Sequence, residues 1–161
     1  MVIIIMGVTA SGKTTIAKAL SEKTNIPYYD ADQYHSEANI LKMSDGIPLT
    51  DEDRKEWLES LSVEIAKWQQ NEGAILACSA LKKTYRQKLQ SKSELPIQWI
   101  YLKVPQEIIQ ERIEARKNHF MNKSLVASQF AILEPPENGY TVDGTNSTEK
   151  IIEEITNKIK S

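Results

Sequence analysis

The sequence predicts an α/β domain in which helices cover both faces of a parallel β-sheet. Apolar, β-branched segments such as residues 2–6 (VIIIM) are typical of strands that are buried on both faces, as they are in parallel sheets. These segments alternate along the chain with segments that carry apolar residues at helical spacing. Five strand segments of this kind occur, and they fit a three-layer domain.

The expected elements follow one another without a repeat or a low-complexity tract. Strands are expected at residues 2–6, 27–30, 74–78, 97–103 and 139–142. Helices are expected at about 13–23, 35–42, 51–70, 82–90 and 105–117, then around 125–133 and 151–159. Thr50 is expected to cap the third of these helices, with Asp53 three residues later as a variant capping box.

Length, charge and cysteine content narrow the class of protein. The chain has 161 residues, which fits a single domain over 1–161, and its net charge of −2 argues against a dedicated nucleic-acid binder. The single cysteine, Cys78, excludes an internal disulfide and is compatible with a reducing compartment. No stretch approaches the roughly 20 apolar residues that a transmembrane helix needs. We therefore expect a cytoplasmic protein that has no membrane or nucleic-acid partner.

A phosphate-binding loop (P-loop) is expected directly after the first strand. Residues 7–14 (GVTASGKT) match the pattern G-x-x-x-x-G-K-[ST] between a buried strand and a helix. In such a loop the backbone N–H groups cradle phosphates, the lysine reaches the β- and γ-phosphates, and the threonine hydroxyl binds Mg²⁺. ATP and Mg²⁺ are therefore the expected cofactors. The residues expected to bind ATP are Gly7, Val8, Thr9, Ala10, Ser11, Gly12, Lys13, Thr14 and Thr15.

The loop alone does not define the reaction. A GTPase is expected to carry an Asn-Lys-x-Asp motif late in the chain, whereas residues 122–125 (NKSL) and 157–160 (NKIK) both lack the aspartate. The chain is also short for a motor or transporter ATPase. These observations favour a small-molecule kinase, which must shield the γ-phosphate from water. The alternative from a different class is a non-catalytic ATP-binding module that regulates a partner.

Several blocks of sequence, in order along the chain, resemble the gluconate kinase family. The blocks cover most of the chain between residues 5 and 136. They are 29–35 (YDADQYH), 39–43 (NILKM), 46–51 (GIPLTD), 53–58 (DRKEWL), 78–86 (CSALKKTYR), 101–103 (YLK), Arg116 with 119–121 (HFM), and 128–130 (SQF) with 133–134 (LE). The chain departs from the family pattern at Ala10 and Ala31, where glycine is frequent, and at Ser36 and Glu56, where proline is frequent. None of these departures removes an ionisable group that the family uses.

The resemblance implies a fold, a reaction and an assembly. The fold is the P-loop kinase type, shared with shikimate and nucleotide kinases, with strand order 2-3-1-4-5, a substrate-binding segment at about 32–70 and a mobile lid at about 118–127. The reaction is the ATP-dependent phosphorylation of D-gluconate to 6-phospho-D-gluconate, and the assembly is a homodimer. A kinase for another hydroxy acid such as shikimate is the runner-up. Shikimate kinases, however, carry a glycine triplet where this chain has residues 78–82 (CSALK).

Two carboxylates are expected at the end of the second strand, where ligands bind in open α/β sheets. Asp32 is assigned to the substrate hydroxyl, as its positioner and as a candidate general base. Asp30 is assigned, with Thr14, to Mg²⁺, because the strand ending at Cys78 lacks the aspartate that commonly holds this metal. Simple turn chemistry is the alternative reading of the pair.

Basic residues are expected to bind the substrate carboxylate and the transferred phosphoryl group. Arg54 is the first choice for the carboxylate, which is best bound by a guanidinium. Lys82 and Arg86, four residues apart on one helix, are expected to help, although a solvated basic face explains them equally well. Arg112 and Arg116 precede the lid and are expected to stabilise phosphoryl charge, with a surface ion pair as the alternative. The remaining expected substrate contact is a hydrogen bond from His35 to a hydroxyl.

Overall fold

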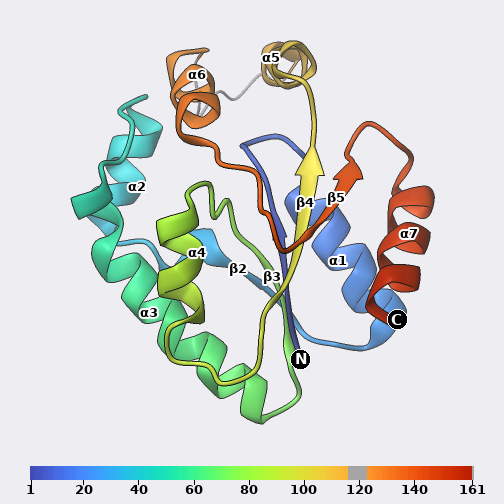
Figure 1. Cartoon of the computed structure of the whole chain (residues 1–161). Coiled ribbons are helices and arrows are strands. Elements are labelled where there is room, and N and C mark those ends of the chain that lie inside the picture. The colour runs from blue at the N-terminus through green and yellow to red at the C-terminus, as the bar shows by residue number, and fades with distance from the viewer. Residues whose placement is uncertain (116–122, 161) are drawn as a thin grey trace.

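The computed structural model describes residues 1–115 and 123–160 and shows one central sheet (Figure 1). Within these residues the sheet has five parallel strands in the order β2-β3-β1-β4-β5, which confirms the expected fold class and strand order. The strands are β1 (Val2–Met6), β2 (Tyr28–Asp30), β3 (Ala74–Ala77), β4 (Gln98–Lys103) and β5 (Tyr140–Asp143). No strand boundary differs from its expected place by more than one residue.

The alternation of side chains along β1 builds two separate cores. Val2, Ile4 and Met6 belong to one buried cluster, whereas Ile3 and Ile5 belong to another on the opposite face of the sheet. All five side chains are completely buried, so β1 is the centre of the three-layer domain. This is the arrangement that continuous apolarity predicts for a central parallel strand.

Helices cover both faces of the sheet (Figure 1). On one face α3 (Asp51–Gln70) and α4 (Lys83–Gln90) pack over the cluster that contains Val2, and on the other face α1 (Lys13–Thr24) and α7 (Thr148–Lys160) pack over the cluster that contains Ile3. The apolar residues expected to face the core of α3 and α7 are buried or partly buried. These are Trp57, Leu58, Leu61, Ile65 and Trp68 in α3 and Ile151, Ile152, Ile155 and Ile159 in α7.

The start of α3 is fixed by the expected capping box. Thr50 Oγ1 accepts a hydrogen bond from the backbone N–H of Asp53 at 3.1 Å, and the Asp53 carboxylate accepts one from the N–H of Thr50 at 2.9 Å. Asp53 also pairs with Lys42, at the end of α2 (Glu37–Ser44), at 2.8 Å. These contacts hold α2 against the first turn of α3, which is the turn that carries Arg54.

Two further helices lie beyond the carboxyl ends of the strands (Figure 1). These are α5 (Gln106–Ala115) and α6 (Lys123–Ile132), and Val126 of α6 shares a buried cluster with Ile109 and Ile113 of α5. The expected lid at 118–127 thus divides into residues 118–122, which lie outside the described residues, and residues 123–127, which form the first part of α6. Across the described part of the chain, no helix is both long enough and apolar enough to cross a membrane.

The short helix expected around residues 35–42 is present as α2, but it begins two residues later and a 3-10 helix precedes it. The segment after β2 was expected to enter a short helix at about residue 35, whereas a 3-10 helix, η1 (Ala31–Tyr34), comes first and α2 begins only at Glu37. The physical reasons are two caps: the Asp30 carboxylate caps η1, and Ser36 Oγ accepts a hydrogen bond from the N–H of Asn39 at 3.2 Å to begin α2. Ser36, which stands where the family often has proline, therefore has a local structural role.

Candidate active site

The candidate site lies at the carboxyl edge of the sheet, where β1 leads into the P-loop. In the strand register Asp30 lies opposite Ala77, and Ala77 lies opposite Ile5, two residues before Gly7. The aspartate at the end of β2 and the start of the P-loop are therefore neighbours along the same edge. Because the strands are parallel, their ends converge there without any further folding of the chain.

The P-loop backbone requires conformations that favour glycine. Gly7 has φ of 154°, and a Cβ at this position would lie 2.8 Å from Ser11 Oγ and 3.0 Å from the carbonyl oxygen of Leu102. Gly12 has φ of 100° at the start of α1. Ala10 also lies in the left-handed region, with φ of 61°, and this is one of the positions where the family often has glycine. The alanine is tolerated there at some cost in backbone strain.

Lys13 is held within its own loop. Its Nζ donates a hydrogen bond to the carbonyl oxygen of Val8 at 2.8 Å. Burial lowers the pKa of Lys13, while the nearby Asp32, Cys78 and Asp30 raise it. The lysine therefore lies within the P-loop and near the carboxylates at the end of β2, where the phosphates of ATP are expected.

Side chains from α5 and α6 also bind the P-loop. Gln129 of α6 accepts a hydrogen bond from the backbone N–H of Thr9 at 2.7 Å, and Arg112 of α5 donates one to the carbonyl oxygen of Ala10 at 2.8 Å. Arg112 also reaches the carbonyl oxygen of Gly144 at 3.4 Å. Arg112 was expected near the phosphoryl group, and it lies beside the phosphate-binding loop. No role was expected for Gln129, although it belongs to a block that carried the family resemblance.

A pocket of about 280 Å³ joins the P-loop to α3 and α6. It brings together most of the side chains expected to act on ATP, metal or substrate. Its charged and polar lining consists of Thr9, Lys13, Thr14, Thr15, Asp30, Asp32, His35, Arg54, Ser79, Ser128 and Gln129. Its apolar wall includes Met43, Pro48, Leu49, Trp57, Leu81 and Leu125. The phosphate-binding end and the Arg54 end therefore belong to one cavity.

The two carboxylates at the end of β2 have different surroundings. Asp30 Oδ1 accepts a hydrogen bond from the N–H of Asp32 at 2.9 Å, and the hydroxyl of Tyr28 lies 3.4 Å from Asp30 Oδ2. Burial raises the pKa of Asp32, the charge of Asp30 raises it further, and Lys13 lowers it. A raised pKa makes the Asp32 carboxylate more basic than an ordinary aspartate, which suits a group that receives a proton.

His35 forms part of the wall between the P-loop pocket and α3. Its ring stacks on Trp57 with 4.2 Å between the ring centres. The amide nitrogen of Asn39 lies 3.3 Å from His35 Nδ1, and because an amide nitrogen only donates, Nδ1 accepts and the proton belongs on Nε2. Burial, and then the charge of Arg54, lowers the pKa of His35 to about 4. At neutral pH this histidine is uncharged.

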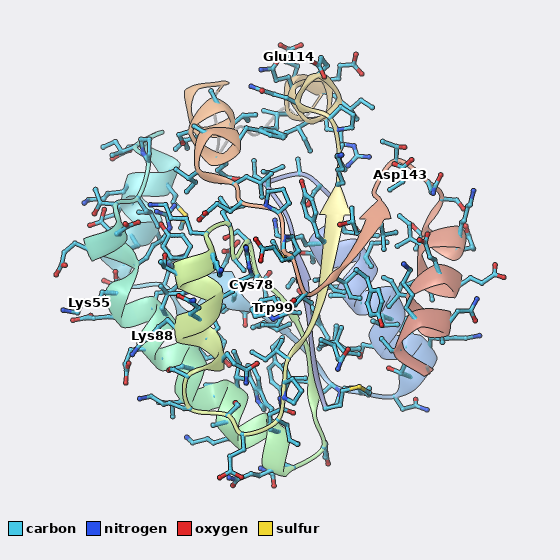
Figure 2. The ribbon with its side chains drawn as sticks, in the orientation of Figure 1. Lys55, Cys78, Lys88, Trp99, Glu114 and Asp143 are labelled. Carbon is cyan, nitrogen blue, oxygen red and sulfur yellow. The ribbon has the colours of Figure 1, made fainter. Side chains whose placement is uncertain are left out.

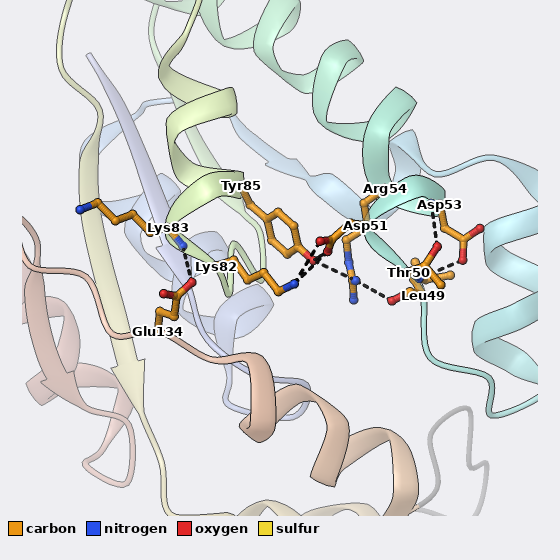
Figure 3. A network of polar contacts seen from close by, with 9 residues as sticks. All are labelled: Leu49, Thr50, Asp51, Asp53, Arg54, Lys82, Lys83, Tyr85 and Glu134. Carbon is orange, nitrogen blue, oxygen red and sulfur yellow. Dashed lines mark hydrogen bonds and ion pairs between the residues drawn. The ribbon is translucent and has the colours of Figure 1, made fainter.

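Arg54 lies in a polar network between α3 and α4 (Figure 3). Its Nη1 donates hydrogen bonds to the carbonyl oxygen of Leu49 at 2.6 Å and to the hydroxyl of Tyr85 at 3.1 Å. The Tyr85 hydroxyl in turn donates to Asp51, which forms an ion pair with Lys82 at 3.0 Å. Arg54 and Lys82, both expected at the substrate, are therefore linked through Tyr85 and Asp51.

Comparisons with known proteins identify the family. A family model described as an AAA domain matches residues 3–131. The chain is also 40% identical to a protein of Dictyostelium discoideum named "Probable gluconokinase", over 99% of this chain and 86% of that relative. The chain belongs to the gluconokinase family. This confirms the resemblance on which the expected fold and site were based.

Solved structures of related kinases superimpose on this gluconokinase-family fold. A gluconokinase from Sinorhizobium meliloti is 35% identical with a TM-score of 0.86, covering 95% of this chain and 87% of the other. A sugar kinase from a Janibacter species is 40% identical with a TM-score of 0.91, covering 98% and 93%. The matches extend over nearly the whole chain, so they include both the P-loop and the segment that carries Arg54.

The structure corrects the role that was expected for Arg86. The guanidinium is buried and donates hydrogen bonds to the carbonyl oxygen of Ala80 at 2.7 Å and to that of Glu134 at 2.8 Å. Lys82 is the residue that precedes α4, so the two do not share a helix face as expected. Arg86 is thus engaged in joining the β3–α4 loop to the segment after α6, and it does not line the pocket.

Arg116, which was expected to stabilise phosphoryl charge, lies outside the described residues, as do residues 119–121 of the family resemblance. Cys78, expected to be a small buried strand residue, is 1% exposed, and burial raises the pKa of its thiol to about 12. Figure 2 shows Cys78 near the middle of the molecule, whereas Lys55 and Lys88 extend outward from α3 and α4. The cysteine is therefore part of the core.

The donor set beside the P-loop fits Mg²⁺ held jointly by protein and nucleotide. Thr14 and Asp30 line the same pocket, and hydroxyl and carboxylate oxygens are ligands that Mg²⁺ prefers. Over residues 1–115 and 123–160, no group of three or more His, Cys, Asp or Glu side chains could by itself hold a metal. In kinases Mg²⁺ is usually held by one or two protein ligands together with the phosphates of the nucleotide.

Proposed function

We propose that this protein transfers the γ-phosphoryl group of ATP to the 6-hydroxyl of D-gluconate and so forms 6-phospho-D-gluconate and ADP. The observation that carries the proposal is the single pocket that joins a P-loop to Arg54. A kinase for a sugar acid needs a phosphate site and a cation at opposite ends of its substrate, and the pocket has both. Membership of the gluconokinase family supports gluconate as the acid.

The phosphate end of the pocket is formed by the P-loop and the start of α1. The backbone N–H groups and Lys13 bind the β- and γ-phosphates, and the cluster of N–H groups at a helix start favours this negative charge. Thr14 and Asp30 would hold Mg²⁺, which supplies charge neutralisation on the phosphate oxygens when it is bound. Arg112 adds a positive charge beside the loop, where it hydrogen-bonds to Ala10.

Asp32 orients the attacking hydroxyl. The 6-oxygen of gluconate forms a new bond to the γ-phosphorus, the bond between that phosphorus and the β–γ bridging oxygen breaks, and ADP leaves. The hydroxyl proton passes to the Asp32 carboxylate. The raised pKa of Asp32 favours this acceptance, and the adjacent Lys13 offsets the charge that two neighbouring carboxylates place beside the phosphates.

Arg54 binds the carboxylate at the far end of gluconate. It is placed at the pocket by the first turn of α3, which the capping box of Thr50 and Asp53 fixes. A guanidinium can form paired hydrogen bonds to a carboxylate, and these are stronger than bonds to a neutral group. Neutral His35 presents its Nε2–H as a hydrogen-bond donor to a hydroxyl group in the middle of the gluconate molecule.

The resemblance to the gluconokinase family also supports three further properties of the protein. We infer a homodimer, a cytoplasmic location and closure over the nucleotide by the lid expected at about 118–127, of which residues 118–122 lie outside the described residues. Sedimentation of the purified protein tests the first of these, because a dimer has twice the mass of the 18.3 kDa chain. A monomer at micromolar concentration would contradict it.

A coupled assay of ADP release, run on a panel of acids, tests the proposed function. D-gluconate is expected to give the highest kcat/KM, with other aldonic acids lower and shikimate at background. Preference for shikimate would establish the runner-up kinase. ATP binding without acid-dependent ADP release from any member of the panel would instead favour the regulatory module.

A further inference from the structure

Among the described residues, the hydrogen bonds of Arg54 use one of its three guanidinium nitrogens. The hydrogen bonds described for this side chain both start from Nη1, and they end on two neutral acceptors, the carbonyl oxygen of Leu49 and the hydroxyl of Tyr85. The guanidinium carbon also lies 5.3 Å from the centre of the Tyr85 ring. Tyr85 therefore holds Arg54 through both its hydroxyl and its ring.

The Tyr85 hydroxyl separates Arg54 from the nearest acidic side chain of the network. It accepts a hydrogen bond from Arg54 and donates its one proton to Asp51 Oδ1, so the hydroxyl joins the two side chains (Figure 3). The hydrogen bond from Tyr85, followed by that from Lys82, lowers the pKa of Asp51. The charges of Lys82 and Arg54 lower this pKa as well, but among the described residues no hydrogen bond or ion pair joins Asp51 directly to Arg54.

Lys82 and Arg54, the two basic residues of this network, differ in whether they already pair with a carboxylate. Lys82 forms an ion pair with Asp51, with Nζ 3.0 and 3.2 Å from its two oxygens. No ion pair is described for Arg54 across residues 1–115 and 123–160, and its partners named above are uncharged. Arg54 lines the P-loop pocket and also a neighbouring hollow of about 460 Å³ that contains Lys82 and Asp51. The cation that can receive a substrate carboxylate is therefore Arg54.

We propose that Tyr85 is a positioning residue for substrate recognition, which keeps Arg54 from pairing with Asp51 and so presents the guanidinium to the substrate carboxylate. The inference rests on the proposed function, since it needs a substrate with a carboxylate. Without the Tyr85 hydroxyl, Asp51 loses a hydrogen bond and a paired contact with Arg54 becomes its best replacement. An arginine paired in this way competes poorly for a second carboxylate.

A double-mutant cycle on Tyr85 and Asp51 tests this competition. In the wild-type background, Tyr85→Phe is expected to raise KM for gluconate about tenfold, while KM for ATP changes less than about twofold. In an Asp51→Asn background, the same Tyr85→Phe change is expected to alter KM for gluconate less than about twofold, because the residue at position 51 no longer has a carboxylate that could capture Arg54. A role in packing alone would give the same effect in both backgrounds.

Tyr29→Phe is the matched control. Tyr29 packs in the same buried cluster but stacks on Trp68, which is 14 residues and roughly 21 Å along α3 from Arg54. This variant should leave both Michaelis constants unchanged. Thermal unfolding of every variant separates loss of substrate recognition from loss of the fold. For a variant that is unfolded at the assay temperature, gluconate binding is measured at a lower temperature instead.

The kinetic results separate a failure of the proposed function from a failure of the role assigned to Tyr85. If the wild-type protein does not phosphorylate gluconate, the proposed function fails. If the wild-type protein is active and Tyr85→Phe leaves KM for gluconate unchanged, or raises it equally in both backgrounds, the assignment of Tyr85 is overturned while the function stands.

Discussion

The backbone N–H of Asp32 donates a hydrogen bond to the carboxylate of Asp30 at 2.9 Å. Through this contact Asp30 caps the 3-10 helix η1 and fixes the backbone that carries Asp32 into the pocket. Asp30 therefore has a structural role in addition to its proposed role at Mg²⁺. From the sequence, capping of a turn and binding of a ligand were alternative roles for this aspartate. The structure is compatible with both roles for the same carboxylate.

Replacement of Asp32 by asparagine is expected to lower kcat by roughly a hundredfold or more while changing ATP affinity little. The amide keeps the size and most of the polarity of the side chain but cannot take the hydroxyl proton. Steady-state kinetics with gluconate and ATP measure both constants. A kcat within a few-fold of wild type would remove Asp32 from the proton transfer.

A magnesium titration separates Asp30 from Asp32. The defect of Asp30→Asn is expected to be reduced by high Mg²⁺, because a weakened metal site fills at higher metal concentration. The defect of Asp32→Asn is expected to persist at every Mg²⁺ concentration. If high Mg²⁺ rescues Asp32→Asn and not Asp30→Asn, the two assignments are reversed.

Replacement of Lys13 by alanine is expected to reduce turnover by at least about a hundredfold, because the lysine neutralises charge on the transferred phosphoryl group. The helix α1 should remain folded, since the described hydrogen bond of Lys13 is to a carbonyl oxygen of its own loop. Lys23→Ala, in the last turn of the same helix, is the matched control. Near-normal turnover of Lys13→Ala with an unchanged circular dichroism spectrum would exclude the proposed role.

Replacement of Arg54 by alanine is expected to raise KM for gluconate far more than KM for ATP. Loss of a hydrogen bond to a charged partner costs about 1.5–3 kcal/mol, which is roughly ten- to a hundredfold in affinity. Lys55→Ala changes the next residue of α3, which is exposed and extends outward (Figure 2), and it serves as control. Equal effects of Arg54→Ala on both constants would move Arg54 out of the substrate end of the pocket.

The stability of the protein is expected to decrease as the pH falls from 6.5 toward 4, in part because of His35. The pKa of this histidine is about 4 in the folded protein and 6.5 in the unfolded chain. Between pH 6.5 and pH 4 the unfolded chain therefore binds a proton at His35 while the folded protein does not. Its contribution is complete above pH 6.5 and is lost as the pH approaches 4.

The difference in unfolding free energy between wild type and His35→Asn isolates this contribution. Urea denaturation at several pH values should show that the difference becomes less favourable to wild type as the pH falls from 6.5 to 4. A difference that is constant over this range would show that His35 is readily protonated in the folded protein.

The features that depend on local pattern could be predicted from the sequence. The continuous apolarity of residues 2–6 predicted a central strand, the P-loop spacing predicted the phosphate site, and Thr50 with Asp53 predicted the helix cap. Each of these features is encoded by residues close together in the chain. Placement of Asp30 and Asp32 at the site followed from the rule that parallel strands end on the same edge.

The features that depend on partners distant in sequence could not be predicted in this way. Arg86 was expected at the substrate, but its partners are two backbone carbonyl groups, one of which lies 48 residues away at Glu134. Gln129 and Tyr85 have no chemical signature of their own, and the contacts that bring them to attention are with Thr9 and Arg54, which are 120 and 31 residues away. Residue type alone does not show whether a buried polar side chain faces a ligand or the protein.

The identity of the phosphorylated product tests the central claim most directly. Purified protein incubated with ATP, Mg²⁺ and D-gluconate is expected to give equal amounts of ADP and of a monophosphate whose ³¹P–¹³C coupling places the phosphate on carbon 6. Lys13→Ala should form neither product at a comparable rate. Phosphate on another carbon would contradict the assignment of the 6-hydroxyl, and ATP hydrolysis to free phosphate with gluconate unchanged would contradict the proposed function itself.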